Sequence, residues 1–293
     1  MKILNVKSIL LVGLSLLTFS CHKETEQRGT VGFTTTASSG DESVGEQSIT
    51  ISLGETVSTA TTIQFTVGGT ASLNGDYSLE TTSPITVAAG QSEFTFKFKV
   101  IDDAIIEFSP DDYITFTITS VSNYTLKSTD NVTYTYTIKD NDSTPTTGLQ
   151  ADLTWNLGDG VDINEVDMDL VILKDVTLDS NGDGGIYSAT QINTNVTSGF
   201  ESYVLSASLA NGDYYIVVYY NTGTVQVPIL LGLSDAVNGY RGYTYTFAAN
   251  QAGYYVYQVT TNTSGTYSRL AGSSRMAGGL KLSSAFLNSI LKK

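Results

Sequence analysis

The sequence predicts an all-β protein made of two tandem β-sandwiches, the first immunoglobulin-like and the second jelly-roll-like. Apolar and polar residues alternate in short segments such as 49–53, 94–98 and 114–118, which gives each segment one buried and one solvated face. Turn-forming residues separate these segments, and the chain holds 27 glycines but only 4 prolines. The length of 293 residues is a little under twice the usual ~150 per domain, so two domains are expected.

The composition excludes several functional classes. The 29 acidic residues outnumber the 15 basic ones and give a formal net charge of −14, whereas a nucleic-acid-binding surface needs clustered cations. We therefore expect no nucleic-acid partner. Because the chain has one cysteine and one histidine, it has no disulfide scaffold, no Cys/His zinc site and no His-dependent Ser or Cys triad in its body.

The first twenty residues have the features of an export signal. Lys2 and Lys7 form a short basic region at the start of the chain. The apolar run over 9–17 that follows is too short to span ~30 Å of hydrocarbon as a helix. The segment ends at Ser20-Cys21 and resembles a bacterial lipoprotein signal, in which the cysteine after the cleavage point becomes the lipidated first residue. The resemblance implies a signal peptide over 1–20, lipidation of Cys21 and a polar leader over 21–30. The alternative is an ordinary signal peptide that leaves an unpaired thiol.

The resemblance to a lipoprotein signal also implies the compartment. We expect a protein of the bacterial cell envelope, lipid-anchored to the outer membrane and facing either the periplasm or the cell surface. The lipid anchor would be its only contact with the membrane. Loss of the two lysines in the signal changes the net charge from −14 to −16, so the exported protein is strongly acidic.

The first domain is expected over residues 31–142. Seven short strands in about 110 residues are typical of an immunoglobulin-like sandwich. The predicted strands cover 31–37, 47–54, 61–68, 83–88, 92–101, 113–121 and 131–139.

Strand direction predicts that the acidic residues of this domain gather at one end. Successive connections in an antiparallel sandwich fall at alternate ends, so twelve of the fifteen carboxylates of residues 30–143 fall at one end. Only Glu55, Glu93 and Asp130 fall at the other, and of the four lysines only Lys139 is close to the twelve in sequence. The twelve are Asp41, Glu42, Glu46, Asp76, Glu80, Asp102, Asp103, Glu107, Asp111, Asp112, Asp140 and Asp142.

Such a group of carboxylates indicates a bound cation. Like charges a few ångströms apart repel by roughly 1–4 kcal/mol per pair, so a fold that gathers them needs a counter-charge. Calcium fits best, because it accepts six to eight oxygen ligands in irregular geometry, whereas magnesium requires a tight octahedron. The alternative is that loops are simply acidic in an acidic protein, which predicts an even split between the two ends.

Several motifs of the first domain resemble the Calx-beta family. They are Glu42-Ser-Val-Gly45, Gly69-Thr-Ala followed by Gly75-Asp76-Tyr77, Val100-Ile-Asp102-Asp103, and Ile138-Lys-Asp140-Asn-Asp142. Order and spacing match over residues 31–142, about 40% of the chain. That family includes the regulatory calcium-binding domains of sodium–calcium exchangers and repeats in extracellular adhesion proteins.

The resemblance implies a set of calcium ligands. Exchanger domains carry Asp-Asp-Asp runs where this chain reads Asp102-Asp103-Ala104 and Asp140-Asn141-Asp142, so fewer charges are available. We expect at least one calcium ion and take two as the working number. Asp112 is preferred to Asp111 as the acidic group before the sixth strand. The implied ligands are Glu42, Asp76, Asp102, Asp103, the backbone carbonyl of Ile105, Glu107, Asp112, Asp140 and Asp142.

A linker over 143–149 leads to the second sandwich, expected over 150–270. Its predicted strands include 166–173, 203–209, 214–220, 225–231, 243–247 and 254–259. Parts of it, such as Leu153-Thr-Trp155 and Asn211-Gly-Asp213, resemble the bacterial pre-peptidase C-terminal type of β domain. The remainder, 271–293, is either a frayed tail or a short helix, since its apolar residues fall near helical spacing.

Two further motifs of the second domain leave alternatives open. The stretch from Asp179 to Gly184 resembles half of an EF-hand loop but lacks the final Glu, so a hairpin turn is favoured over a weak calcium site. The same-face pairs Tyr243/Tyr245 and Tyr255/Tyr257 suit either strand packing, which is favoured, or stacking on sugars.

Together these patterns predict a non-enzymatic, calcium-binding envelope lipoprotein that acts as an adhesion or interaction module. Its partners would be calcium ions and an extracellular protein or glycan. Because Asp140 and Asp142 directly precede the linker, a metal there would also stiffen the junction between the domains. The alternative is a carbohydrate- or protein-capture lipoprotein in which the aromatic second domain binds and calcium is incidental. A two-carboxylate glycosidase is permitted by residue inventory, but no pocket-forming motif supports it.

Overall fold

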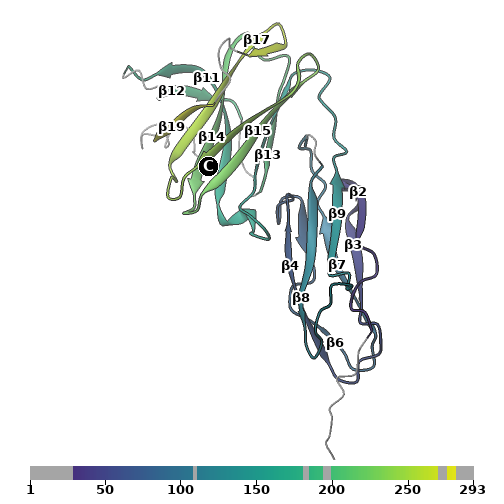
Figure 1. The fold of residues 1–293 in the computed structure, drawn as a ribbon. Helices are drawn as coiled ribbons and strands as arrows, with labels where there is room; N and C mark the ends of the chain where they lie inside the picture. Colours follow the sequence, from purple (N-terminus) through teal and green to yellow (C-terminus); the bar gives the residue numbers. More distant parts are fainter. Residues whose placement is uncertain (1–28, 108–110, 181–184, 194–198, 270–275, 282–293) are drawn as a thin grey trace, which may run out of the picture.

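The structure, a computed structural model, describes residues 29–107, 111–180, 185–193, 199–269 and 276–281. Within these ranges the chain forms two β-sandwich domains, one following the other along the molecule (Figure 1). This confirms the predicted all-β class. The predicted signal segment 1–20, the lipidation site Cys21 and most of the leader lie outside the described residues. In the described part of the chain, no helix is both long and apolar enough to cross a membrane.

The first domain consists of two sheets. The strands are β1 (Gly32–Phe33), β2 (Ala37–Asp41), β3 (Glu46–Ser52), β4 (Thr61–Gly69), β5 (Tyr77–Leu79), β6 (Ile85–Val87), β7 (Glu93–Val100), β8 (Tyr113–Val121) and β9 (Thr133–Lys139), with a short 3₁₀ helix, η1 (Glu42–Val44), between β2 and β3. Sheet A has the order β1-β3-β7-β5 and sheet B the order β2-β9-β8-β4-β6. Pairing is antiparallel except between β2 and β9, which run parallel.

The alternating segments of the sequence form the inner faces of these sheets. Along β7, Phe96 and Phe98 are fully buried while Lys97 points to solvent, as the period of two predicts. The Phe96 ring stacks on Phe65 with centroids 5.2 Å apart and meets Phe116 edge-on at 5.1 Å. Such aromatic pairs add stabilisation beyond their buried area, so they hold the two sheets in register beneath the loops.

The first predicted strand, 31–37, is wrong as a single element. Residues 32–33 join sheet A, whereas 37–41 join sheet B beside β9. The sequence 37–41 has no apolar alternation and its residues are mostly exposed, so backbone pairing alone makes it a strand. The three-residue strand β5 was also not expected, since it is too short to show a period.

The second domain is a second two-sheet sandwich. Its strands are β10 (Leu149–Trp155), β11 (Asp167–Leu178), β12 (Ile186–Gln191), β13 (Glu201–Leu205), β14 (Gly212–Thr222), β15 (Val227–Asp235), β16 (Gly239–Phe247), β17 (Tyr254–Thr263), β18 (Thr266–Arg269) and β19 (Ala277–Lys281), with a 3₁₀ helix η2 (Ile163–Glu165). Sheet C has the order β13-β10-β15-β16; sheet D has the order β12-β11-β14-β17-β18, with β19 also on β17. All pairs are antiparallel and the chain crosses repeatedly between the sheets, as in a jelly roll.

The domain boundaries differ slightly from those predicted. Leu149, placed in the linker, already belongs to β10 and is fully buried. At the other end, 277–281 pair with β17 as strand β19 and form neither tail nor helix. The apolar spacing over 280–291 that suggested a helix therefore begins inside a strand, and residues 282–293 lie outside the described part.

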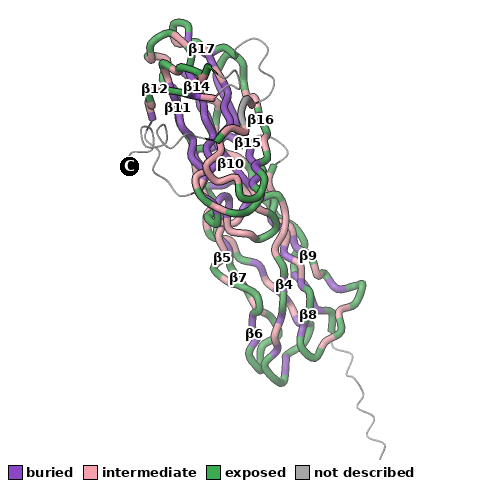
Figure 2. Tube along the Cα trace, turned by 90° about the vertical axis from the view of Figure 1, so that its left-hand side faces the viewer, coloured by how far each residue is buried: buried purple, intermediate pink, exposed green. Residues whose placement is uncertain are grey.

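The two domains touch through loops at one end of the first sandwich. These loops lie between the buried strands of the two domains (Figure 2). Leu73 forms a bridge with Asp162, and its backbone oxygen accepts from the N–H of Ile163 at 3.1 Å. The ring of Phe200 lies so close over Gly75 that a Cβ there would meet it at 2.6 Å. The acidic end of the first domain is thus the end that faces the second.

Candidate metal centre

Four connections of the first domain bring carboxylates to this end. They are η1 after β2, the loop between β4 and β5, the loop between β7 and β8, and the segment after β9. The path of the loop 69–76 is fixed at its start by Gly69. Gly69 has a φ of +120°, and a Cβ there would lie 2.1 Å from the carbonyl oxygen of Tyr113. That same oxygen accepts hydrogen bonds from the backbone N–H groups of Thr70 and Ala71, so a residue without a Cβ is needed at position 69 for this approach.

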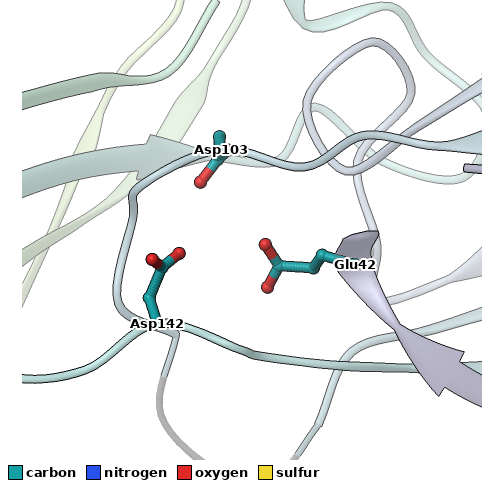
Figure 3. Close-up of side chains that lie close together, drawn as sticks. All are labelled: Glu42, Asp103 and Asp142. Atoms are coloured by element: carbon teal, nitrogen blue, oxygen red, sulfur yellow. The ribbon is translucent and has the colours of Figure 1, made fainter. Parts of the chain in front are cut away.

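A first cluster consists of Glu42, Asp103 and Asp142. Each offers one oxygen, and these three oxygens lie within 4.8 Å of one another. The side chains point toward a common centre from η1, from the loop after β7 and from the segment after β9 (Figure 3). Gly45, with φ +67°, turns the chain directly after η1, and its carbonyl accepts from Val100 N–H at 3.0 Å. The turn therefore fixes Glu42 against the end of β7.

Glu42 is the least satisfied side chain of the centre. It is only 3% exposed, and neither carboxylate oxygen has a hydrogen-bond partner. Burial, and after it the charges of Asp103, Asp140 and Asp142, raise its pKa to about 8, and the backbone N–H of Asp103 acts in the opposite direction. A buried carboxylate without a partner costs free energy, because its charge is removed from water and no hydrogen bond or counter-charge replaces the lost hydration. The missing partner fits a cation.

A second cluster consists of Asp76, Glu107 and Asp112, whose oxygens also lie within 4.8 Å of one another. Asp76 is 6% exposed, and its carboxylate accepts from Ser72 N–H. Burial raises the pKa of Asp76 to about 7 and that of Glu107 to about 10, with the neighbouring acids contributing to both. Burial also raises the pKa of Asp112. These shifts favour the protonated form of the three carboxyl groups when no cation is bound.

The remaining predicted ligands take supporting positions. Asp140 accepts hydrogen bonds from Glu107 N–H at 2.8 Å and from Asp142 N–H at 2.6 Å. Asp102 accepts from the side chain of Asn141 at 3.0 Å. Ile105 is buried, and its N–H donates to Asp103 at 2.7 Å.

The structure distinguishes Asp112 from Asp111. Asp112 belongs to the second cluster, as preferred, whereas the adjacent Asp111 is exposed. Whether any of the predicted residues binds metal stays a prediction.

One basic residue reaches the acidic end from a distant part of the sequence. Lys97 of β7 pairs with the exposed Glu46 at the start of the neighbouring strand β3. This pair forms because β3 and β7 are neighbours in sheet A, so Lys97 is near the acidic end in space although only Lys139 is near it in sequence. Among the described residues, however, no lysine or arginine forms an ion pair with either cluster. Within the described ranges, no cationic side chain therefore offsets the charge of the two clusters.

This donor set fits calcium. All six side chains offer oxygen, they come from loops with irregular spacing, and Glu42 has a buried, unpartnered carboxylate directed into the first cluster. Hard divalent cations select such ligands, and calcium tolerates irregular geometry. The residues that would hold one ion are Glu42, Asp103 and Asp142; those that would hold another are Asp76, Glu107 and Asp112.

One carboxylate near the centre was missed by the sequence reasoning. Asp152 of β10, in the second domain, is 2% exposed, and the charge of Asp142 contributes to raising its pKa to about 6, after burial. A cavity of about 150 Å³ at the junction is lined by Glu107 and Asp112 on one side and by Asp152 and Tyr240 on the other. The sequence signal was slight, because Gln150 and Asp152 belong to the polar face of an alternating strand that also includes Thr154.

The described residues of the second-domain motifs show no competing site. Tyr243, Tyr255 and Tyr257 are buried, so the tyrosine pairs pack within the domain and present no exposed platform for sugars. Asp179 lies at the hairpin between β11 and β12, where its N–H donates to Gly185 O at 2.6 Å. This agrees with the hairpin interpretation, although residues 181–184 lie outside the described part.

Comparisons with known proteins give only distant similarity. No family model matches the chain, and no curated protein matches it. The structure is similar to an apo-form Calx CBD1 domain, with 23% identity, TM-score 0.34, and coverage of 39% of this chain and 97% of that one. It is similar to a structure described as calcium binding domain CBD12 of CALX1.1, with 14% identity, TM-score 0.34, and coverage of 71% and 82%. It is also similar to the CupB2 chaperone of Pseudomonas aeruginosa, with 6% identity, TM-score 0.27, and coverage of 73% and 100%. TM-scores this low carry no functional argument, so the function is argued from the site.

Proposed function

We propose that this protein is a non-enzymatic calcium-binding module. The observation that carries the proposal is Glu42, whose two buried oxygens have no partner and face Asp103 and Asp142. A second carboxylate cluster lies beside the first, since the charge of Glu42 also acts on Glu107. Two adjoining clusters without basic partners in the described part of the chain support two calcium ions.

The motifs of the first domain support the same proposal. The positions that resemble Calx-beta ligands come from four separate connections, and six of them converge in the two clusters. Gly45 and Gly69, which belong to the resembling motifs, hold the loops through conformations that a side chain would disturb. A family pattern whose residues meet in space is better support than the pattern alone. The assignment to a Calx-beta-like domain is part of this proposal.

The wider role we propose is that of an adhesion or interaction module on the bacterial envelope, anchored through Cys21. Calcium would hold the loops at the junction of two rod-like sandwiches and so keep the second domain at a set orientation. A module of this kind binds an extracellular protein or glycan and performs no chemistry. The lipoprotein-like signal segment supports the location.

The decisive experiment is isothermal titration of calcium into the chain without its predicted signal, residues 22–293, after treatment with a chelator. We expect a measurable heat of binding that fits about two sites, and a rise in the unfolding temperature when calcium is present. The matched control is magnesium, which should compete poorly because it requires octahedral geometry. No calcium heat and no thermal shift at millimolar calcium would refute the proposed function.

A further inference from the structure

The segment that joins the two clusters is held by the second domain. Residues 103–107 carry Asp103 of the first cluster and Glu107 of the second. Between them, the backbone oxygen of Ala104 accepts a hydrogen bond from Nε2 of Gln150 at 2.6 Å. Two residues on, the N–H of Ile106 donates to Oδ2 of Asp152 at 3.3 Å. Both partners lie on β10, so one strand of the second domain grips both sides of residue 105.

Asp152 is itself held rigidly. It accepts from the hydroxyl of Ser202 at 2.6 Å and from Nε2 of Gln150 at 3.0 and 3.2 Å. It is buried in the central part of sheet C, where β10 pairs with both β13 and β15. A side chain with these contacts has one orientation, and its position follows that of the whole sheet. It can therefore transmit the placement of the second domain to the backbone of Ile106.

A second set of contacts acts on the other loop of the centre. The hydroxyl of Ser72 donates to the backbone oxygen of Trp155 at 3.2 Å, and the side chain of Asn156 donates to Thr70 O at 2.7 Å. Ser72 N–H in turn donates to Asp76 of the second cluster. The same strand, β10, thus reaches the loop 70–76 from its far end. Both loops that supply the second cluster are contacted by the second domain.

Resting on the calcium function proposed above, we infer that Asp152 and Gln150 are positioning residues of the calcium centre, supplied from outside the domain that binds the ion. They accept from and donate to the backbone of residues 104–106 and so hold Asp103 and Glu107 apart at the spacing the two clusters need. Their placement makes the affinity of the first domain for calcium depend on the docked second domain.

The dependence acts in both directions. If docking of the second domain raises the calcium association constant by some factor, then bound calcium must raise the equilibrium constant for docking by the same factor. No contact between the ion and the second domain is required. Bound calcium fixes the segment 103–107, and a fixed segment offers Ala104 O and Ile106 N–H to β10 without further loss of chain entropy.

The test is calcium titration of residues 22–293 carrying Gln150→Ala or Asp152→Ala. We expect the calcium dissociation constant to rise about tenfold, within the usual range for coupling between sites. The matched control is Asp213→Asn, which removes one carboxylate charge from an exposed position on β14 that bonds Thr261. It should leave calcium affinity unchanged. Thermal unfolding in chelator shows whether each variant retains a folded second domain.

A conservative variant separates positioning from charge. Asp152→Asn keeps an oxygen that can accept from Ile106 N–H, so it should restore most of the calcium affinity that Asp152→Ala loses. Equal losses in both variants would show that only the charge of Asp152 matters, and would overturn the positioning role. Gln150→Ala, which changes no charge, gives an independent measure if Asp152→Ala does not fold.

The reciprocal effect is measured with spin labels, one in each domain. Distance distributions between them should narrow when calcium is added to the unaltered chain and narrow less in Gln150→Ala. If the unaltered chain binds calcium but both junction variants bind it equally well, the inference fails and the calcium function stands. If the unaltered chain binds no calcium, the proposed function itself fails.

Discussion

The backbone N–H of Glu107 donates a 2.8 Å hydrogen bond to the carboxylate of Asp140, thirty-three residues later in the chain. Glu107 belongs to the second cluster, and Asp140 lies beside the first, where its charge raises the pKa of Glu42. One hydrogen bond therefore ties the loop after β7 to the segment after β9. The two clusters form a single centre in which a change in one alters the other.

Substitution of Glu42 tests the first cluster. Because its buried carboxylate has no partner, Glu42→Gln should weaken the calcium site of the first cluster by about fivefold or more, since a unit charge at ~4 Å contributes roughly 1–4 kcal/mol. Above pH 8 the metal-free variant should be more stable than the unaltered chain, because a buried charge has been removed. Titration calorimetry and urea denaturation in chelator measure the two effects.

Glu46→Gln is the matched control for Glu42→Gln. Glu46 lies four residues away at the same end of the domain, but it is exposed and paired with Lys97. An exposed ion pair contributes little, so this variant should bind calcium as the unaltered chain does. If both variants lose calcium affinity equally, the acidic end attracts calcium only through its total negative charge, and Glu42 has no special role as a ligand.

The second cluster is tested by two neighbouring residues. Asp112→Asn should reduce the calcium stoichiometry from about two to about one, because it removes one of three carboxylates that converge with Asp76 and Glu107. Asp111→Asn, next in sequence and exposed, should leave both sites intact. Equal stoichiometry for the two variants would mean that Asp112 is not an essential ligand of a separate second site. Titration calorimetry, with ion counts by atomic absorption, decides between these outcomes.

Much of this arrangement follows from the sequence, for identifiable reasons. Alternation predicted the long strands, and strand direction predicted that Glu42, Asp76, Asp103 and Asp142 lie at one end. Neither reasoning separates the carboxylates into two clusters, because that depends on loop paths such as the turn at Gly45. The position of β2 was missed because parallel pairing with β9 leaves no pattern in Ala-Ser-Ser-Gly-Asp.

The contribution of the second domain could not be predicted. Gln150 and Asp152 are polar residues in a buried strand, and nothing in their spacing shows that they meet residues 104–106 of another domain. Such contacts depend on how two sandwiches dock, which is decided by surfaces assembled from many segments. Sequence periodicity reports on one element at a time.

The loop that carries Asp76 depends on Gly69. A Cβ at this position would lie 2.1 Å from the carbonyl oxygen of Tyr113, and the φ of +120° is strained for any other residue. Gly69→Ala should therefore cost more than the ~1–3 kcal/mol of backbone strain alone and should also weaken calcium binding at the second cluster. Gly90→Ala is the control, since φ is +88° but no atom lies within 4 Å of its Cβ. Urea denaturation should show a smaller loss of unfolding free energy for Gly90→Ala than for Gly69→Ala. The reverse order would show that the close approach at Gly69 is not what makes this loop sensitive.

The pKa values of the centre predict an unusual dependence of stability on pH in the metal-free protein. Burial raises the pKa of Asp103 to about 6, of Asp76 to about 7 and of Glu42 to about 8, from ordinary values of 3.8 and 4.5. At pH values between the ordinary and the raised pKa of each group, the folded state binds more protons than the unfolded state. The free energy of unfolding must then fall as pH rises from about 4 to about 8, and Glu107, whose pKa is raised to about 10, extends the fall beyond pH 8.

Calcium should reverse this dependence, because it binds the deprotonated carboxylates and its affinity rises over the same pH range. Binding near pH 7 should release protons, which titrations in buffers of different ionisation enthalpy detect. Urea denaturation at several pH values, with chelator and with saturating calcium, measures the stability directly. A metal-free protein whose stability is constant between pH 4 and 8 would show that these carboxylates are solvated and that the buried centre is not formed in solution.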